Sequence, residues 1–417
     1  MMLNMKKSFI FFGRVFILLS FLFSLSVYSE GNETYPVINT NRILSSEYLS
    51  STYHRVESIS IENGFYQFDI DSDIGHFTVF SLALLKKRVN EIKTLGQVIN
   101  QFEQQNDQFS GELRSELSVS GESAVDILTS PFSTASKLAG QLTNNLGDTL
   151  AGEDPYVDDA SPRYSYKEPG DPTTAAHKRN IAFQLGLDLY SNNNKVQSFL
   201  NVVANARSSG KVSAGVGLAN AFSQSSNLSE LDRQISFTIK SKSLSELMTY
   251  NRQLLDNLKI KTSLADAFID HAYLSPTNKT TILVYLNEMK KVSKPASFIE
   301  LTLTANNEVM ALAFERVSKM LLHYYNNVEG FSAYFNFKGQ PAVITDSRRI
   351  VLFEYADFLI WSPRTEKQYV QSAEHAERSG YDGWELVSLG TVSPFANQKI
   401  SELGYKLRFN FLSEYLN

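Results

Sequence analysis

The sequence predicts a helix-rich α+β fold: a small N-terminal antiparallel sheet with a long helix, a central helical region, and a small C-terminal α/β unit. Two apolar–polar alternations flank Asn63-Gly64, a pair that favours a type I′ hairpin. Apolar residues then recur at steps of three and four over much of residues 82–327. From residue 350 onward, strand-like and helix-like stretches alternate, which is typical of parallel strands joined by helices.

The N-terminus carries a predicted export signal. Residues 1–29 contain Lys6, Lys7 and Arg14 but no acidic residue, and residues 15–27 are nearly all apolar. That run is shorter than the roughly 20 residues that a membrane-spanning helix needs. We therefore expect cleavage after Ser29 and a periplasmic or secreted protein, with an uncleaved membrane anchor as the alternative. Residues 30–51 are polar and predict a flexible leader.

Composition excludes several classes of function. The absence of cysteine excludes disulfides, thiol catalysis and Cys-ligated metal. The chain has 39 basic and 44 acidic residues, so its formal charge is −5. Without the three basic residues of the leader, the balance is 36 against 44, or −8. This charge opposes general binding to nucleic acid, and no Walker, G-x-G-x-x-G or H-E-x-x-H motif is present, so we expect no cofactor.

Residues 52–153 predict a βββα module followed by short helices with small residues. Strands are expected at 56–61, 65–70 and 76–80, and an apolar stripe from Leu82 to Phe102 predicts the long helix. Charged residues such as Arg88 and Glu91 fill much of the other side of that helix. Short helices are expected at 124–128 and 138–142. Residues 154–174 contain prolines 155, 162, 169 and 172 and read as a linker between domains.

Residues 175–329 predict a helical domain, either a bundle or an irregular array. Helices are expected at 181–189, 196–203, 244–258, 263–273, 280–292 and 295–327. Asn306-Asn307 is a candidate interruption of the last helix.

Residues 330–417 predict the α/β unit and a candidate ligand site. Strands are expected at 331–337, 342–345, 350–361, 384–389 and 405–411, with helices at 365–379 and 393–403. Ligands of open α/β sheets bind beyond the carboxyl ends of the strands. The residues at two such ends are therefore candidate ligand-binding residues, with ordinary connecting loops as the alternative. They are Trp361, Ser362, Arg364, Gly390, Thr391 and Ser393.

A calcium loop is a weak further candidate. Asp69, Asp71, Asp73 and Gly75 begin like one, but the glycine falls one position late and no glutamate follows at the required spacing. A solvated turn is therefore favoured over loose calcium binding.

Four stretches of the sequence are similar to a family of proteins. Residues 65–91, 186–190 with Asn194, 274–276 and 389–405 resemble an uncharacterised family of exported bacterial proteins with no assigned activity. The resemblance implies an exported protein of mixed helix and sheet, and it transfers no catalytic residue.

The functional expectation is a non-enzymatic binding or scaffolding protein of the cell envelope, whose partner is an envelope protein or a glycan. The alternative is an envelope hydrolase or transferase with its site in the C-terminal unit. A minor third hypothesis is peripheral membrane contact through the helices that contain Leu128, Leu138, Val212 and Val216.

Overall fold

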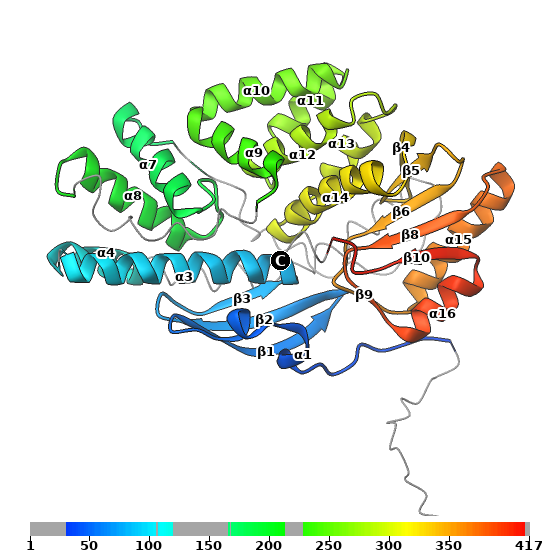
Figure 1. Cartoon of the computed structure of the whole chain (residues 1–417), viewed down its shortest axis with the longest axis horizontal. Helices are drawn as coiled ribbons and strands as arrows, with labels where there is room; N and C mark the ends of the chain where they lie inside the picture. The colour runs from blue at the N-terminus through cyan, green and yellow to red at the C-terminus, as the bar shows by residue number, and fades with distance from the viewer. Residues whose placement is uncertain (1–30, 106, 120–165, 167, 213–227, 413–417) are drawn as a thin grey trace, which may run out of the picture.

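A computed structural model describes residues 31–105, 107–119, 166, 168–212 and 228–412 (Figure 1). Within these residues the fold is α+β, with a three-stranded sheet near the N-terminus, a layer of helices, and a five-stranded sheet in the C-terminal part. The predicted export signal, the short helices at 124–128 and 138–142, and most of the expected linker lie outside the described residues. None of the described helices has both the length and the hydropathy needed to cross a bilayer.

The N-terminal hairpin and its helix are confirmed. Strands β1 (His54–Glu62) and β2 (Phe65–Ser72) pair in antiparallel fashion, and β3 (Phe77–Phe80) pairs with β2. Asn63 and Gly64 both have positive φ, 50° and 87°, as a type I′ turn requires. The apolar stripe of α3 (Leu82–Gln105) covers this sheet, burying Leu85, Val89 and Ile92.

The charged face of α3 is not solvated. Arg88 and Glu91 are only 2% and 3% exposed, and Arg88 contacts both Glu91 and Glu308. Lys87 pairs with Glu308 and with Asp188. The helix therefore lies between the sheet and the helical layer, and its charged residues pair with residues 100 to 221 positions away in the sequence.

Residues 31–51, expected to be a flexible leader, contain two short helices, α1 (Thr40–Ile43) and α2 (Ser46–Leu49). Leu44 is 7% exposed and belongs to the apolar core, against which Ile38 and Tyr48 also pack. These few apolar residues pack the segment against the rest of the protein. The sequence did not indicate this, because the composition of the segment is mostly polar.

The helical layer contains the expected helices and two that the sequence did not predict. Asn307 separates α13 from α14, because its side chain accepts a hydrogen bond from the Met310 N–H and begins a new helix. The two unpredicted helices are α4 and α9, and both come from polar stretches. The described helices of this layer are α4 (Asp107–Val119), α7 (Pro172–Leu185), α8 (Asn194–Ser208), α9 (Glu230–Ser241), α10 (Leu244–Asn257), α11 (Thr262–Ile269), α12 (Pro276–Glu288), α13 (Ala296–Thr302) and α14 (Glu308–Asn327).

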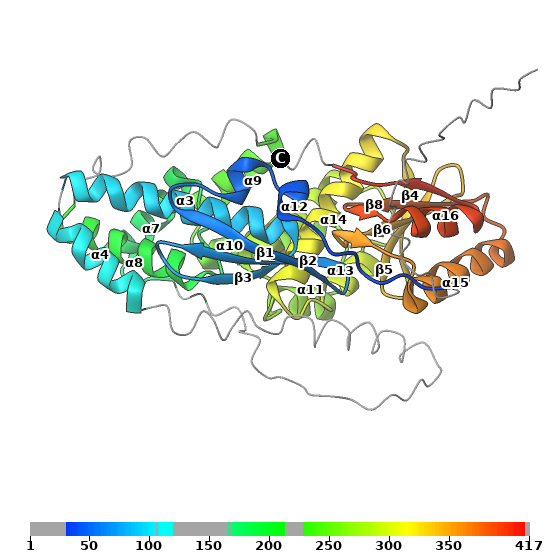
Figure 2. The ribbon, with the colours of Figure 1, turned by 90° about the horizontal axis from the view of Figure 1, so that it is seen from below.

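The C-terminal sheet has the order β10-β8-β6-β5-β4. Strands β6, β8 and β10 are parallel, as expected, and are joined through α15 (Pro363–Ser379) and α16 (Pro394–Glu402), while β4 and β5 form an antiparallel hairpin (Figure 2). The expected strand at 350–361 is interrupted after Glu354, and its remainder forms a separate short pair, β7 with β9. The strands are β4 (Phe331–Phe337), β5 (Gln340–Thr345), β6 (Ile350–Glu354), β7 (Phe358–Leu359), β8 (Trp384–Ser388), β9 (Thr391–Val392) and β10 (Tyr405–Arg408).

The apolar cores extend across the boundaries expected from the sequence. One cluster of buried residues runs from Leu44 to Val309 and includes both the N-terminal sheet and the helices α7 to α9. A second cluster runs from Leu254 to Leu412 and joins α14 to the C-terminal sheet. Because α14 contributes to both clusters, it connects the two halves of the described chain.

Candidate functional site

The two candidate loops lie next to each other beyond the parallel strands. The pairing of β7 with β9 sets Leu359 opposite Val392, and the Ser393 N–H donates to the Leu359 carbonyl at 2.9 Å. The topology therefore brings the two groups of predicted residues together. They differ, however, in what their side chains contact.

The residues of the second loop, and Trp361, have roles within the fold. Gly390 packs so closely that an added Cβ would lie 2.1 Å from the Asp357 carbonyl oxygen. Thr391 Oγ1 donates to Asn410 Oδ1 at 3.3 Å, and Ser393 caps α16 by accepting from the Ala396 N–H at 3.0 Å. Trp361 is 4% exposed and packs in the outer apolar cluster, as does Trp384, so its ring is part of the core.

Ser362 and Arg364 line a cavity of about 690 Å³, which we call the edge cleft. Its walls come from four parts of the chain that are distant in sequence. They are the N-terminal residues 33–35, the hairpin turn at 63–65, the connection between α13 and α14, and the C-terminal unit around β6 and the start of α15.

The hairpin turn is fixed to the C-terminal unit at the edge cleft. The Phe358 N–H donates to the Gly64 carbonyl at 2.9 Å, and a Cβ on Gly64 would lie 3.1 Å from that of Ala356. The carboxylate of Asp357 accepts from the Tyr66 N–H at 3.2 Å and from the Leu82 N–H at 2.9 Å, at the start of α3. Burial raises the pKa of Asp357 to about 6, although the nearby Arg316 and the two N–H groups lower it.

The N-terminal residues 33–35, which we call the strap, lie across the C-terminal unit. The Glu33 carboxylate accepts from the Trp361 N–H at 2.7 Å and from Ser393 Oγ at 2.6 Å, while the Glu33 N–H donates to the Trp361 carbonyl at 2.7 Å. Figure 1 shows this segment running from the C-terminal unit toward α1. Two of the predicted ligand-binding residues, Trp361 and Ser393, thus form hydrogen bonds with the protein's own N-terminal segment.

A row of polar side chains crosses the edge cleft. Gln368 donates to Gln340 at 2.6 Å, and Gln340 donates to Glu354 at 3.5 Å. The other oxygen of Glu354 accepts from the N–H groups of Tyr355 and Ala356 at 3.0 and 3.1 Å. Both carboxylate oxygens are therefore already engaged.

Two donors of the edge cleft remain unused within the described part of the chain. The side chain of Arg364 is exposed and makes no hydrogen bond or ion pair with a described residue. Asn306 is 9% exposed, and its Nδ2 lacks an acceptor among the described residues. Its Oδ1 accepts from Asn307 Nδ2 at 2.9 Å, which fixes the orientation of the amide. The cleft thus offers an exposed cation to a ligand, and a residue of its wall, Asn306, holds a buried amide donor without an acceptor among the described residues.

Aromatic rings supply the apolar part of the lining. Tyr35, Phe65, Tyr355 and Phe358 all contribute, and Tyr355 stacks on Phe65 with a centroid distance of 6.2 Å. Burial raises the pKa of Tyr35, while Arg364 lowers it and Glu354 raises it, so its hydroxyl lies within the field of both charged groups. Tyr35 is 36% exposed and is held on the strap.

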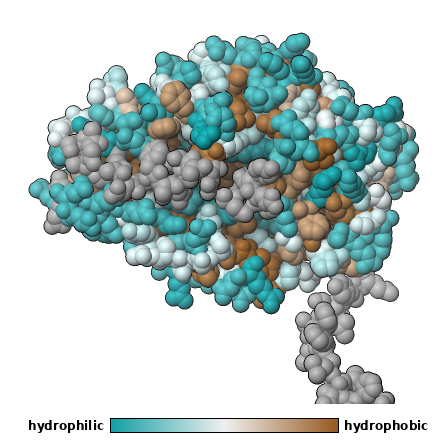
Figure 3. Space-filling view, viewed as in Figure 1, coloured by the Kyte–Doolittle hydropathy of each residue, from teal (hydrophilic) through white to brown (hydrophobic). Residues whose placement is uncertain are grey.

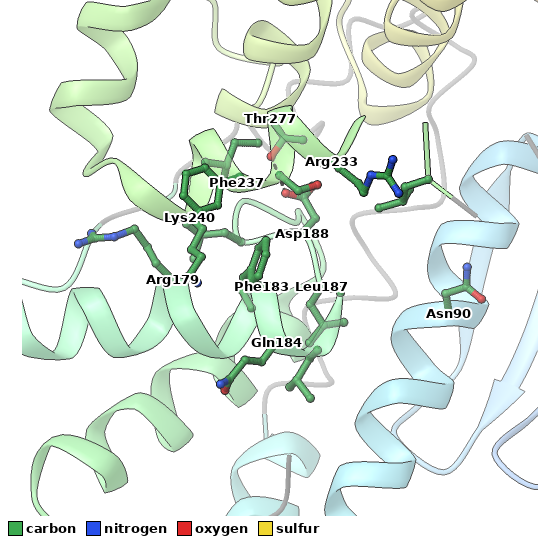
Figure 4. Close-up of a pocket in the computed structure, with 17 residues that line it drawn as sticks. Asn90, Arg179, Phe183, Gln184, Leu187, Asp188, Arg233, Phe237, Lys240 and Thr277 are labelled. Atoms are coloured by element: carbon green, nitrogen blue, oxygen red, sulfur yellow. Dashed lines mark hydrogen bonds between the residues drawn. The ribbon is translucent and has the colours of Figure 1, made fainter. Parts of the chain in front are cut away.

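A second cavity, of about 790 Å³, lies between α7, α9 and the start of α12 (Figure 4). It is more apolar, with Phe183 and Phe237 directed into it. Its charged groups have partners: Arg179 pairs with Glu168, and Asp188 is bound by Lys87. Residues 213–227, which lead directly into its wall at Leu228, are not among the described residues. We therefore regard the edge cleft as the candidate site.

The weak calcium candidate has no support from the described residues. Asp69 accepts from Ser58 Oγ at 2.6 Å and from Thr78 Oγ1 at 2.8 Å, while Asp71 and Asp73 are exposed. Over the part of the chain that the structure describes, no group of three or more potential ligands is arranged to hold a metal ion.

Sequence reasoning identified two residues of the edge cleft, Ser362 and Arg364, and missed the others. Tyr35 and Asn63 come from segments more than 280 positions earlier in the chain, and no local pattern connects them to β6. Asn306 carried a signal, the Asn-Asn pair that breaks the helix, but that signal indicated a cap and not a site.

Comparisons with known protein families, with curated proteins and with solved structures give no match to this chain.

Proposed function

We propose that this protein is an exported, non-catalytic binding protein of the cell envelope, and that it holds part of a glycan in the edge cleft. Export is supported by the composition of residues 1–29, a basic start followed by a short apolar run. The observation that carries the binding proposal is the cavity of about 690 Å³, lined by aromatic rings and by side-chain amides.

A sugar matches this lining because it has both apolar and polar surfaces. Aromatic rings such as Tyr35 can cover its C–H faces, while the amides of Gln368 and Asn63 can each donate and accept hydrogen bonds, as hydroxyl groups require. Ligand sites generally combine an apolar lining with a few such polar groups.

Binding is favoured over hydrolysis because the carboxylates of the cleft are engaged in the fold. Glu33 binds the Trp361 N–H and Ser393, and Glu354 binds two backbone N–H groups and the Tyr369 hydroxyl. A glycosidase needs one carboxyl group that donates a proton and a second that acts as base or nucleophile. The engaged pair supports a binding role.

The exposed surface favours a ligand cleft over a scaffold. Large exposed apolar residues among those described are few and spread over different elements, including Tyr35, Phe237 and Phe409. On the face in Figure 3, apolar areas are separated by hydrophilic surface. A scaffold is expected to present one larger continuous apolar patch.

The test uses the mature chain, residues 30–417, and isothermal titration with oligosaccharide fragments of envelope glycans. We expect saturable binding without release of shorter products, and weaker binding in Tyr35→Ala, because the strap loses its exposed ring. Phe237→Ala is the control, since that ring is 60% exposed but lies at the second cavity. Absence of binding to every fragment, or cleavage of a fragment, would overturn the proposal.

Export is tested separately by cell fractionation and by sequencing the N-terminus of the purified protein. We expect the mature chain to begin at Glu30. Recovery of the intact chain from the cytosol would contradict export.

A further inference from the structure

We infer that the ligand of the edge cleft is an acidic glycan, in which the carboxylate of a uronic acid binds Arg364 and a neighbouring oxygen binds the amide of Asn306. This inference rests on the proposed function and specifies its ligand.

Several acceptors of the cleft are engaged within the fold. Both oxygens of Glu354 accept hydrogen bonds, Oε2 of Glu33 accepts from the Trp361 N–H and from Ser393 Oγ, and Gln340 Oε1 accepts from Gln368. A ligand that presents acceptor oxygens to the cations of the cleft leaves these contacts in place.

Two donors of the cleft have no acceptor among the described residues. Arg364 has no ion-pair partner among the described residues, and the Nδ2 of Asn306 is buried without an acceptor there. A buried donor that lacks an acceptor is unfavourable, so an oxygen of a ligand that reached it would remove that cost. The planar guanidinium can bind both oxygens of a carboxylate, which favours a carboxylate as the anionic group.

The position of Arg364 strengthens its attraction for an anion. It lies in the first turn of α15, a helix of 17 residues, where the partial positive charge of the helix N-terminus adds to that of the guanidinium. Lys338, another cation of the lining, hydrogen-bonds to the neutral side chain of Gln371 and keeps its charge uncompensated there.

The experiment compares two matched probes by isothermal titration of the mature protein: an oligogalacturonide and the corresponding neutral galactose oligosaccharide. We expect the acidic probe to bind about tenfold more tightly, with a preference that falls as salt is raised, since the contact is a charge-assisted hydrogen bond. Arg364→Gln should abolish this preference, so that the two probes bind the variant with equal affinity. Arg378→Gln is the matched control, because Arg378 lies at the other end of α15 and pairs with Glu374 on the surface.

Asn306→Asp tests the second contact. The replacement keeps an oxygen that accepts from Asn307 but removes the amide donor and adds a negative charge. We therefore expect it to weaken binding of the acidic probe more than binding of the neutral probe. Circular dichroism and thermal denaturation establish that each variant is folded.

The outcomes separate the two proposals. Equal affinity for both probes in the wild type, or a preference that persists in Arg364→Gln, would overturn the acidic-ligand inference and leave the glycan-binding function standing. Absence of binding to either probe would overturn this inference, and the proposed function then depends on the wider set of fragments.

Discussion

Asp357 is an acidic residue buried at the junction of the N-terminal sheet, α3 and the C-terminal unit. It is 6% exposed, and its carboxylate accepts from the N–H groups of Tyr66 and Leu82. The positively charged Arg316 is near it. The residue therefore joins distant segments while remaining poorly solvated, and its ionisation has a cost.

That cost predicts a pH dependence of stability. Burial raises the pKa of Asp357 from 3.8 to about 6 in the folded protein, so the folded state binds this proton more tightly than the unfolded state. The resulting stabilisation is complete below pH 3.8 and is lost as pH rises to about 6. From the size of the shift, the loss is about 3 kcal/mol.

Asp357→Asn isolates this effect, because an amide oxygen can still accept both N–H groups but does not titrate. Urea denaturation of both proteins between pH 4 and 7 should show the variant gaining stability relative to wild type by about 3 kcal/mol as pH rises. Two curves that stay parallel over this range would refute the assignment.

Gly390 predicts a second effect at the scale of one residue. A Cβ at this position would lie 2.1 Å from the Asp357 carbonyl oxygen and 2.4 Å from that of Ala356, and these backbone atoms cannot move aside cheaply. Gly390→Ala should lower the free energy of unfolding by about 1–3 kcal/mol, as overpacking does.

Gly111 provides the matched control for that substitution. It lies in α4, and an added Cβ would have no described atom outside its own helix backbone within 4 Å, so Gly111→Ala should stabilise the protein by about 0.5–1 kcal/mol through helix propensity. Thermal denaturation of the two variants should therefore shift in opposite directions. Equal shifts would mean that Gly390 is not a packing glycine.

At the scale of elements, α3 and α14 are joined by buried ion pairs. Glu308, near the start of α14, contacts Lys87 at 3.1 Å and Arg88 at 3.1 Å, and Arg88 also contacts Glu91. The positive charges dominate the surroundings of Glu308 and lower its pKa despite burial. The carboxylate compensates two cations that would otherwise be poorly solvated.

Glu308→Gln should therefore lower the free energy of unfolding by about 3 kcal/mol or more, since breaking a buried pair leaves an uncompensated charge. Glu300→Gln, an exposed glutamate on α13, should change it little. Chemical denaturation at neutral pH measures both. A small effect at Glu308 would show that solvent compensates Lys87 and Arg88.

The sequence correctly predicted those elements whose structure is determined by their own residue pattern. The Asn63-Gly64 turn, the stripe of α3 and helix α16 depend on neighbouring residues only. Helices α4 and α9 were missed because their apolar residues are few and their sequences are polar. The burial of Arg88 could not be predicted, since its partner Glu308 is 220 positions away.

The candidate site was predicted in part for the same reason. The rule for parallel strands located Ser362 and Arg364, which follow β6 and the short β7 in the chain. It also selected Gly390 and Ser393, which share that edge of the sheet but serve packing and capping. Tyr35 and Asn306 reach the cleft only through tertiary contacts.

At the scale of the whole molecule, α14 belongs to both halves. Val309 packs in the N-terminal core, while Phe314 and Tyr324 pack against the C-terminal sheet. Tyr324 also donates to Glu385 at 3.2 Å. The C-terminal unit is thus required to cover the second face of this helix.

A fragment ending at residue 329 should consequently fail to fold independently. It would expose Phe314 and Tyr324, which are 1% and 0% exposed in the full chain. We expect it to bind a hydrophobic dye and to lack a cooperative thermal transition, whereas the chain from residue 30 to 417 shows one. A fragment that unfolds cooperatively would establish the C-terminal unit as a separate domain.

The contacts of Glu33 join residues 328 and 360 positions apart. Loop closure over such a distance makes contacts of this kind slow to form. A ribosome has to synthesise Ser393 before the strap can close, so the final wall of the cleft is assembled only when translation is nearly complete. Prematurely terminated chains would therefore lack a finished cleft.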